Sequence, residues 1–331
     1  MALGKIDGVL DSNIGKASAL TSSNLGKIGG NSYSELGRAI FGGGHSGSPI
    51  ANMDYISIPT TGNSTNFGNL SATGYSLAAA SSSTRGVFSG GYSTSYNNTM
   101  DYVTIATIGN ASDFGDLTSA KSSHAGCGNS SRGVFGGGYV SAGEINTIDY
   151  ITIATTGNSS SFGQITYGGG GSLSSCSSST RGIFGGGGSN VEYYANIEYF
   201  TIANMGNTTS FGNLTVGRSN LSALSSTTRG VFAGATVAPW ATFLNVIDYI
   251  TIASTGNATD FGDLDTNKSN IGSASNSIRG TWAGGIAAGG TRIQLISYIT
   301  ISTTGNSSSF GNLTVAKQST TGLSDSHGGL S

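Results

Sequence analysis

One phrase recurs six times along the chain and limits what the chain can fold into. Each copy opens with an arginine and a small residue, followed by a β-branched residue, an aromatic ring and a glycine-rich run. The copies start at residues 38, 85, 132, 181, 229 and 279, so their spacing is 47–50 residues. Repetition on this scale builds one body from equivalent units that bury their apolar faces against each other.

The remainder of each unit has the pattern of short β-strands. Residues 149–153 (DYITI) alternate apolar and polar side chains after an acid-tyrosine pair, and only the sixth unit, with Ser297, lacks the acid. Such alternation predicts a strand with one buried face. A Gly-Asn pair then supplies turn residues that tolerate positive φ, and a Phe-Gly segment and a Ser/Ala-rich segment complete the unit. Four short strands in each repeat of this length predict a β-propeller.

The units resemble the kelch repeat of galactose-oxidase-like propellers. The resemblance rests on the small-residue strand, the Phe-Gly-Gly segment and the Asp-Tyr pair, and it covers residues 38–313. It implies an all-β, six-bladed, kelch-like β-propeller with four-stranded blades and a short N-terminal arm. Strand A would be the inner Ser/Ala-rich strand, B the arginine strand, C the acid-tyrosine strand and D the outer Phe-Gly strand. Residues 248–264 (DYITIASTGNATDFGDL) also look like repeats in structural proteins of marine bacteriophages.

The C-terminal residues 314–331 repeat the approach to strand A, but no strands B to D follow them. We therefore predict that they close the propeller, formed by residues 38–331, by supplying strand A of its first blade. Closure of this kind removes two open sheet edges. Residues 28–36 are the alternative source of that strand.

The N-terminal residues 1–37 carry a second, shorter repeat. A Leu/Ile-Gly-Lys motif recurs every 11 residues and merges with the first arginine phrase; its apolar and basic members are Leu3, Lys5, Ile14, Lys16, Leu25 and Lys27. Glycine in every copy disfavours a helix, and so short a segment cannot hold a core of its own. We predict an extended arm that docks on a larger particle; the alternative is a leader without a docking role.

Strand order divides the loops between two faces. The A–B and C–D turns, which hardly vary among the units, share one face, called the uniform face. The B–C and D–A loops share the other, called the variable face, because the B–C loops differ in length and content. Binding residues usually lie on variable loops held by a rigid scaffold. The candidate binding residues there are aromatic rings, which beside Asn, Ser and Thr suit sugars, although each could be packing: Tyr92, Tyr96, Tyr139, Tyr193, Tyr194, Trp240 and Phe243.

Two charged positions recur in the repeat. The arginines lie on the uniform face, either as an anion site or, as we favour, as structural residues that bond neighbouring carbonyls and stack on a ring: Arg38, Arg85, Arg132, Arg181, Arg229 and Arg279. We expect the acid before each tyrosine to accept hydrogen bonds from backbone amides near the glycines.

Side chains with catalytic or metal-binding chemistry are few. His45, His124 and His327 occupy unrelated repeat positions, and no metal-ligand spacing links them to the cysteines. Cys127 and Cys176 occupy the same place in adjacent units, and we expect buried thiols, with a bond between them left open. We predict no catalytic residue, metal site or cofactor, and so no enzyme.

Composition restricts the class of protein further. Charged residues are only 9% of the chain, against about a quarter in typical soluble domains, and the net charge of −2 argues against nucleic-acid binding. No apolar run is long enough to insert in a membrane, and residues 1–16 lack the apolar core of a secretory signal. These properties together indicate a virion protein, assembled in the host cytoplasm and released by lysis.

We therefore predict a non-enzymatic phage structural or adhesion protein: a tail fibre, decoration or receptor-binding protein, in multiple copies per particle. Its variable face would bind host surface glycans or another virion protein, and its arm would bind other virion proteins. The alternative is a secreted or surface lectin-like scaffold propeller of a bacterium. A propeller hydrolase or oxidase is the weakest hypothesis.

Overall fold

The structure is a computed structural model that describes residues 37–166, 170–189, 192–237 and 242–330, with the backbone of 27–28 and 31–32. The chain divides into two units, Met1–Leu36 and Gly37–Ser331. In the first unit, β1 (Lys27–Ile28) pairs with β2 (Asn31–Ser32) in an antiparallel hairpin. Lys27 of the predicted arm thus begins β1. The other arm residues lie outside the described residues: Leu3, Lys5, Ile14, Lys16 and Leu25.

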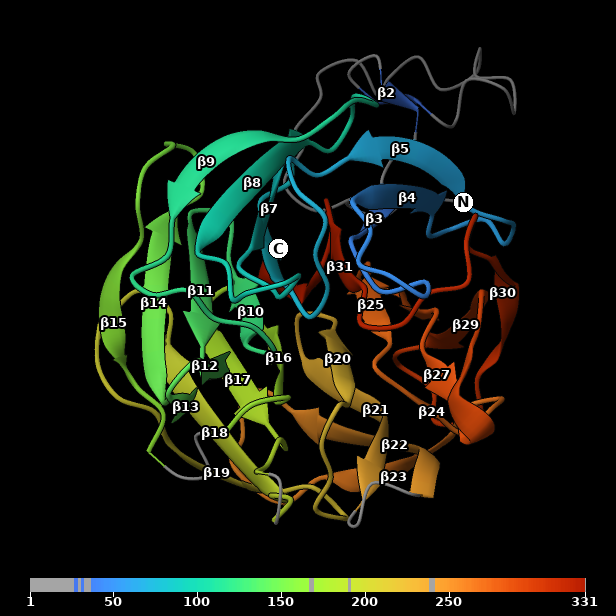
Figure 1. The fold of residues 1–331 in the computed structure, drawn as a ribbon. Helices are drawn as coiled ribbons and strands as arrows, with labels where there is room; N and C mark the ends of the chain where they lie inside the picture. The colour runs from blue at the N-terminus through green and yellow to red at the C-terminus, as the bar shows by residue number, and fades with distance from the viewer. Residues whose placement is uncertain are drawn as a thin grey trace, which may run out of the picture. The chain divides into compact units, whose positions relative to one another are not determined.

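The second unit is all-β, and its sheets have a propeller-like arrangement (Figure 1). Its described residues contain six antiparallel four-stranded sheets, here numbered 1–6, each with strands in the order A, B, C, D. In the order of sheets 1–6, the inner A strands are β31 (Thr321–Ser324), β6 (Ala78–Ser81), β10 (Ala125–Gly128), β16 (Ser174–Ser177), β20 (Ser222–Ser225) and β25 (Gly272–Ser275). The B strands are β3 (Arg38–Gly42), β7 (Arg85–Ser89), β11 (Arg132–Gly136), β17 (Arg181–Gly185), β21 (Arg229–Val237) and β26 (Arg279–Ala283).

The two outer strands of each sheet carry the acid-tyrosine and Phe-Gly segments. The C strands are β4 (Asn52–Ser57), β8 (Thr99–Thr104), β14 (Thr147–Thr152), β18 (Asn196–Thr201), β22 (Thr242–Thr251) and β29 (Leu295–Thr300). The D strands are β5 (Thr65–Asn69), β9 (Ser112–Asp116), β15 (Ser160–Gln164), β19 (Thr209–Asn213), β23 (Thr259–Asp263) and β30 (Ser308–Asn312).

Short elements decorate the loops and the C-terminus. They are the hairpin of β12 (Tyr139–Val140) and β13 (Gly143–Glu144), the small sheet of β24 (Lys268–Ser269), β27 (Ile286–Ala287) and β28 (Thr291–Arg292), and the 3-10 turns η3 (Ala288–Gly290) and η4 (Gly328–Leu330). Within the described ranges, none of the helical segments has the length and apolar character that crossing a membrane requires.

The C-terminal strand completes the sheet that contains the first arginine strand. β31 pairs antiparallel with β3, with Ala39 opposite Ser324 and Gly42 opposite Thr321, and the two lie side by side in Figure 1. The inner strand of sheet 1 therefore comes from the C-terminal segment and not from residues 28–36. Neighbouring inner strands contact each other in a circuit that runs through all the A strands and returns from β25 to β31.

Glycines allow the sheets to pack closely. The B strands carry a set of fully buried rings: Phe41, Phe88, Phe135, Phe184, Phe232 and Trp282. A Cβ atom added to Gly136 would lie 2.6 Å from the ring of Phe184, and one added to Gly42 would lie 2.8 Å from the ring of Phe88. The small residue after each aromatic residue thus leaves a space, and the aromatic ring of the next sheet fills it.

A second contact between sheets places a large side chain of one sheet against a glycine of the next. A Cβ atom added to Gly86 of sheet 2 would lie 2.5 Å from a methyl group of Leu323 in sheet 1. The residue after the arginine is glycine in five units and Ala39 in the other, and Ala39 packs in one cluster with the small Ala274 of sheet 6. The facing residues at these two positions, Gly86 with Leu323 and Ala39 with Ala274, are therefore complementary in size.

The Gly-Asn turns cover the outer edges of the sheets. Asn110 of sheet 2 accepts a hydrogen bond through Oδ1 from the backbone N–H of Asn69 in strand D of sheet 1 (3.0 Å), and Gly109 donates its N–H to Phe67 O (2.9 Å). The equivalent asparagines make the same contact around the circuit: Asn63, Asn158, Asn207, Asn257 and Asn306. An open strand edge is an aggregation site, and these turns protect it.

The size match predicts a coupled pair of substitutions. Gly86→Ala alone should lower the free energy of unfolding by about 1–3 kcal/mol, because the new methyl group collides with Leu323. Leu323→Ala alone should also destabilise, through a cavity of the kind that costs about 2–5 kcal/mol. The double variant should lose less free energy of unfolding than the two single variants lose together, as measured by urea denaturation. Strict additivity would contradict the size match.

Candidate functional site

The arginines of the repeat clamp neighbouring sheets on the uniform face. Each guanidinium carbon lies 4.3–4.8 Å from the ring centroid of a tyrosine in its own sheet. Nη1 of Arg38 donates to Ile105 O (3.0 Å) and Ala106 O (2.8 Å) in the C–D turn of sheet 2. Arg279 of sheet 6 reaches Ile58 O of sheet 1 (3.0 Å), so the contacts run around the whole circuit. These residues thus bond the carbonyls of the neighbouring turn and stack on a ring of their own sheet.

The acids of strand C have partners other than the ones we expected. Asp101 accepts from the backbone N–H (2.8 Å) and hydroxyl (2.9 Å) of Ser71, which follows strand D of the preceding sheet. Asp54 accepts the hydroxyl of Thr314 in the same way. The partners are thus Ser and Thr residues of the neighbouring sheet and not amides near the glycines. Sequence analysis of one unit at a time could not show this contact between units.

Buried cations meet these acids. Lys121 lies 2.8 Å from Asp149, Arg218 2.7 Å from Asp248 and Lys317 3.1 Å from Asp54, with both side chains of each pair at most 1% exposed. Burial lowers the pKa of each of these basic groups, and the facing carboxylate opposes that shift. The sequence signal for them is a Lys or Arg at one repeated position of the D–A loop.

The sixth sheet keeps its charge balance by a different route. Its strand C has Ser297 in place of the acid, and the cation facing it is Lys268. The acid has moved to Asp265 in the D–A loop of sheet 5, which accepts the Ser297 hydroxyl (2.8 Å) and lies 3.5 Å from Lys268 Nζ. Position 265 is Thr or Ser in the other units, so the acid and the hydroxyl have exchanged places.

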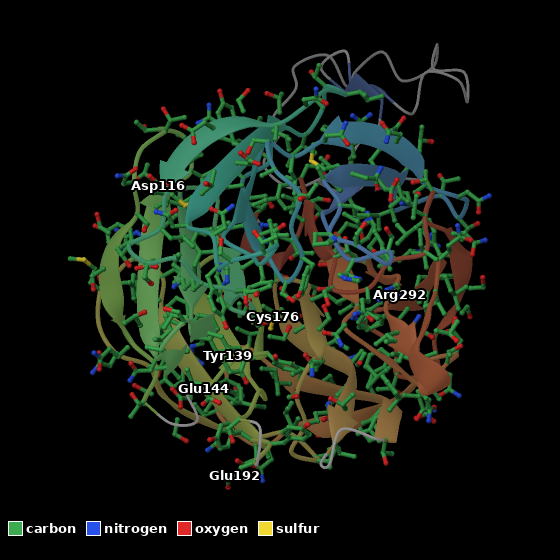
Figure 2. All side chains as sticks on the ribbon, in the orientation of Figure 1. Asp116, Tyr139, Glu144, Cys176, Glu192 and Arg292 are labelled. Atoms are coloured by element: carbon green, nitrogen blue, oxygen red, sulfur yellow. The ribbon has the colours of Figure 1, made fainter. Side chains whose placement is uncertain are left out.

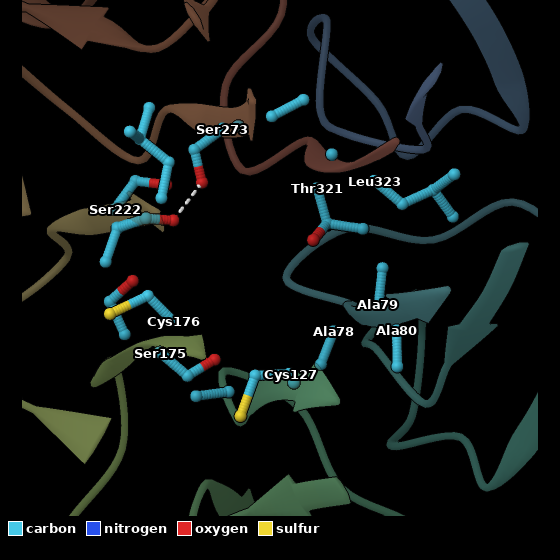
Figure 3. Close-up of a pocket in the computed structure, with 18 of the residues that line it drawn as sticks. Ala78, Ala79, Ala80, Cys127, Ser175, Cys176, Ser222, Ser273, Thr321 and Leu323 are labelled. Atoms are coloured by element: carbon cyan, nitrogen blue, oxygen red, sulfur yellow. Dashed lines mark hydrogen bonds between the residues drawn. The ribbon is translucent and has the colours of Figure 1, made fainter. Parts of the chain in front are cut away.

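The inner strands surround a central cavity of about 160 Å³ (Figure 3). Small and hydroxyl-bearing side chains such as Ala78, Ser222 and Thr321 line it. At its mouth on the variable face, equivalent residues of successive units form a continuous ring of backbone N–H to O hydrogen bonds: Ser76, Ser123, Ser172, Asn220, Asn270 and Ser319. All six have left-handed φ of 53–60°, which this ring holds in place.

The C-terminal segment lies at the other end of the cavity. Serine hydroxyls at this end form a chain of hydrogen bonds, each to the backbone carbonyl of the neighbouring inner strand. In order, the chain runs through Ser81, Ser324, Ser275, Ser225 and Ser177 to Gly128 O. Gly128 has no hydroxyl to continue this chain, and His327 Nε2 lies 3.1 Å from Ser81 O instead. His327 Nδ1 accepts the N–H of Gly329 (3.1 Å), so the neutral ring uses both nitrogens.

The two cysteines are free and buried. Their sulfurs point away from the cavity in Figure 3, and a Cβ on Gly230 of the next sheet would lie 2.7 Å from Cys176 Sγ. Burial raises the pKa of the Cys127 thiol to about 12 and that of Cys176 well above its usual value. Protonated thiols packed between sheets are poor nucleophiles.

Aromatic rings of the variable face form two neighbouring groups, which together are called here the aromatic arc. Its first part runs from sheet 1 to sheet 2 through edge-to-face contacts: His45 to Tyr75 (5.2 Å between centroids), Tyr75 to Tyr92 (5.8 Å) and Tyr92 to Tyr96 (5.1 Å). Backbone hydrogen bonds between Tyr75 and Tyr92 (2.9 and 3.0 Å) fix the loops that carry the rings. Nη2 of Arg292 from sheet 6 lies 3.0 Å from His45 Nδ1 and extends the arc by a cation.

The second part of the arc lies on sheets 3 and 4. The Tyr139 hydroxyl donates to Gly188 O (2.9 Å), which joins the B–C loops of these sheets. Burial raises the pKa of Tyr139 to about 12, with smaller effects from Glu144, Tyr193, Tyr194 and Tyr96. Figure 2 shows Tyr139 and Glu144 close together and Arg292 across the molecule. The arc thus combines half-buried rings with a carboxylate and a guanidinium.

The arc contains most of the predicted binding residues and some that we missed. Tyr92, Tyr96, Tyr139, Tyr193 and Tyr194 belong to it, whereas Phe243 lies apart in β22 of sheet 5 and Trp240 lies outside the described residues. His45, Tyr75 and Arg292 were not predicted. His45 and Tyr92 share the position after the glycine pair, and an alignment of the repeats would have found both.

Comparison of the sequence with models of known protein families and with curated proteins finds no match. Among the described residues, no group of three or more His, Cys, Asp and Glu side chains is arranged to hold a metal ion. The assignment of function therefore depends on the chemistry of the two faces.

The buried histidines predict a pH-dependent stability. Burial lowers the pKa of His327, and that of His124 well below its usual value. The unfolded chain therefore binds protons at higher pH than the folded chain, so this stability is complete above about pH 6.5 and is lost as the pH falls below it. The free energy of unfolding should be lower at pH 5.5 than at pH 7.5. It should fall less in His124→Leu, which restores the leucine found at this position in three sheets; an unchanged slope would contradict the assignment.

Proposed function

We propose that the second unit is a six-bladed, kelch-like β-propeller, and that the chain is a non-enzymatic structural or adhesion protein of a bacteriophage particle. The aromatic arc would bind host surface glycans or another virion protein, with the chain in multiple copies as a tail fibre, decoration or receptor-binding protein. The observation that carries this proposal is the arc itself: rings from four sheets gathered on the face whose loops diverge.

The chemistry of the arc favours glycans as ligands. Tyrosine rings present flat apolar faces for the C–H groups of a sugar, and their hydroxyls offer hydrogen bonds to its hydroxyl groups. Edge-to-face packing and backbone hydrogen bonds hold the rings in position before binding, which reduces the entropy lost on association. Glu144 and Arg292 at the two parts of the arc provide charged contacts for a substituted sugar or for a protein partner.

The resemblance of the repeats to structural proteins of marine bacteriophages supports the assignment to a virion. The composition agrees with it, because the hydroxyl and amide groups of Ser, Thr and Asn side chains rather than charges solvate the surface of this chain. Residues 1–37 would dock the propeller on other virion proteins. We propose no catalytic role and no cofactor.

Ligand binding by the arc predicts a clear mutational result. Tyr96→Ala and Tyr193→Ala should each weaken binding to polysaccharide purified from the host surface by about 30-fold, the loss of a central aromatic contact. Calorimetric titration measures this. Met205→Ala is the matched control, because Met205 is 63% exposed on the uniform face and its loss should leave the affinity unchanged. Equal losses in all three variants, or none, would sink the assignment of the arc.

The place of the protein in a particle needs a separate experiment. Mass spectrometry of purified phage should find the chain in multiple copies, and antibodies against it should label intact particles. Its absence from the particles would refute the virion assignment and leave the alternative of a bacterial surface lectin.

A further inference from the structure

Four D–A loops place a basic side chain at the same buried point between two sheets. Lys121, Arg218, Lys268 and Lys317 occupy one repeat position and are fully buried. Lys317 shows the surroundings of the charge: Nζ lies 3.1 Å from Asp54 Oδ2, 3.1 Å from Asn52 Oδ1, 3.4 Å from Phe41 O and 3.5 Å from Asn52 O. The point at Lys317 Nζ is therefore an oxygen-lined cation site that a side chain fills.

Gly74 occupies this position in the loop between sheets 1 and 2. Its N–H donates to Ile50 O (3.2 Å) and its carbonyl accepts from the N–H of Gly44 (2.8 Å). Lys121 makes the same two backbone bonds, to Asn97 O and from Gly91 N–H. The loop backbone is thus equivalent, and only the basic side chain is missing.

The acid that faces Gly74 has kept its position. Asp101 is 6% exposed, and its Oδ2 accepts both bonds from Ser71. Its Oδ1 is buried and has no hydrogen-bond partner among the described residues. A buried carboxylate oxygen without a partner is costly, and the sister sites avoid that cost with a cation.

A cavity of about 20 Å³ lies between this carboxylate and the glycine. Gly74, Phe88, Thr99 and Asp101 line it. Phe88, Thr99 and Asp101 are the repeat equivalents of the residues whose oxygens surround Lys317 Nζ. About 10–15 Å³ is enough for one water-sized particle. The cavity therefore matches, in place and size, the ammonium group of the sister sites.

We propose that this cavity binds one small monovalent cation, of the size of K⁺ or NH₄⁺. The cation neutralises the Asp101 carboxylate, as the basic side chain neutralises the facing acid in the sister sites. A single carboxylate with neutral oxygens balances one positive charge. The ammonium-to-carboxylate distances of 2.8–3.1 Å in the sister sites set the spacing of the oxygens. Mg²⁺ and Ca²⁺ need contacts of about 2.0–2.6 Å, and Ca²⁺ at least six oxygen ligands, so they fit this cavity poorly.

Sheets 3 and 4 meet at an interface that solves the same problem differently. The facing acid there is Glu198, which is one methylene longer than aspartate. It reaches the N–H of Thr166 (3.0 Å) and the hydroxyl of Thr208. In sheet 2 the position of Thr208 is Ala111, which has no hydroxyl, and Oδ1 of Asp101 has no hydrogen-bond partner among the described residues. The cation site is therefore specific to the interface of sheets 1 and 2.

Thermal unfolding of the full chain tests the proposal. The midpoint in KCl or NH₄Cl should exceed that in tetramethylammonium chloride of equal ionic strength by about 2–4 °C, because only the small cations can bind the folded state. Gly74→Lys should remove this difference and unfold in every salt at or above the wild-type midpoint in KCl. Among the described residues, only Tyr92 O and a Leu77 methyl group lie within 4 Å of the new Cβ, both beyond 3.6 Å, so the new Cβ has room.

Two further variants keep the test decisive. Asp101→Asn removes the charge and should also abolish the difference between salts. Gly62→Lys adds a lysine at an exposed turn, where no atom of the described residues lies within 4 Å of the new Cβ, and should keep the wild-type difference. An anomalous difference map from a crystal grown in RbCl should show a peak beside Asp101 Oδ1. Equal wild-type midpoints in all salts, or a water without anomalous signal at that point, would overturn the proposal.

Discussion

The contact between neighbouring sheets is what the rest of the structure depends on. Each sheet leaves its arginine, its acid and its outer edge incomplete. The next sheet completes the arginine and the outer edge, and the preceding sheet completes the acid. Arg38 bonds the carbonyls of sheet 2, Asp101 of sheet 2 takes the hydroxyl of Ser71, and Asn110 covers the edge of strand D in sheet 1. A single unit therefore has unsatisfied polar groups on both sides, and stability belongs to the circuit rather than to any one sheet.

Departures from the repeat occur in matched pairs across these contacts. Ala39 replaces glycine where the facing residue is Ala274, and Ser297 replaces an acid where Asp265 supplies one. Gly128 lacks a hydroxyl where His327 contacts the free carbonyl of Ser81. Gly74 is a departure that no side chain matches, and the proposed cation would supply the missing charge. Divergence of one unit is thus constrained by the unit beside it.

Sequence patterns could predict the elements of this fold better than its contacts. Period-two alternation and the Gly-Asn turns located the four strands of each unit, and the orphan segment at residues 314–331 indicated where the C-terminal strand pairs. The partners of the acids could not be predicted, because they lie in a different unit from the motif that contains the acid. Tyr75 was missed for a related reason: its D–A loop and the B–C loop that carries His45 are adjacent only after the sheets assemble.

The pairing of β31 with β3 also bears on how the protein is made. Sheet 1 receives its inner strand from the segment that the ribosome synthesises after all other strands of the sheets. Until then β3 presents an unpaired edge, and the neighbouring sheets lack the contacts that Leu323 provides. The first sheet of a nascent chain therefore stays incomplete until β31 is synthesised, and its open edge can pair with other chains. Truncation of even the last dozen residues would remove β31 and so prevent the final step of folding.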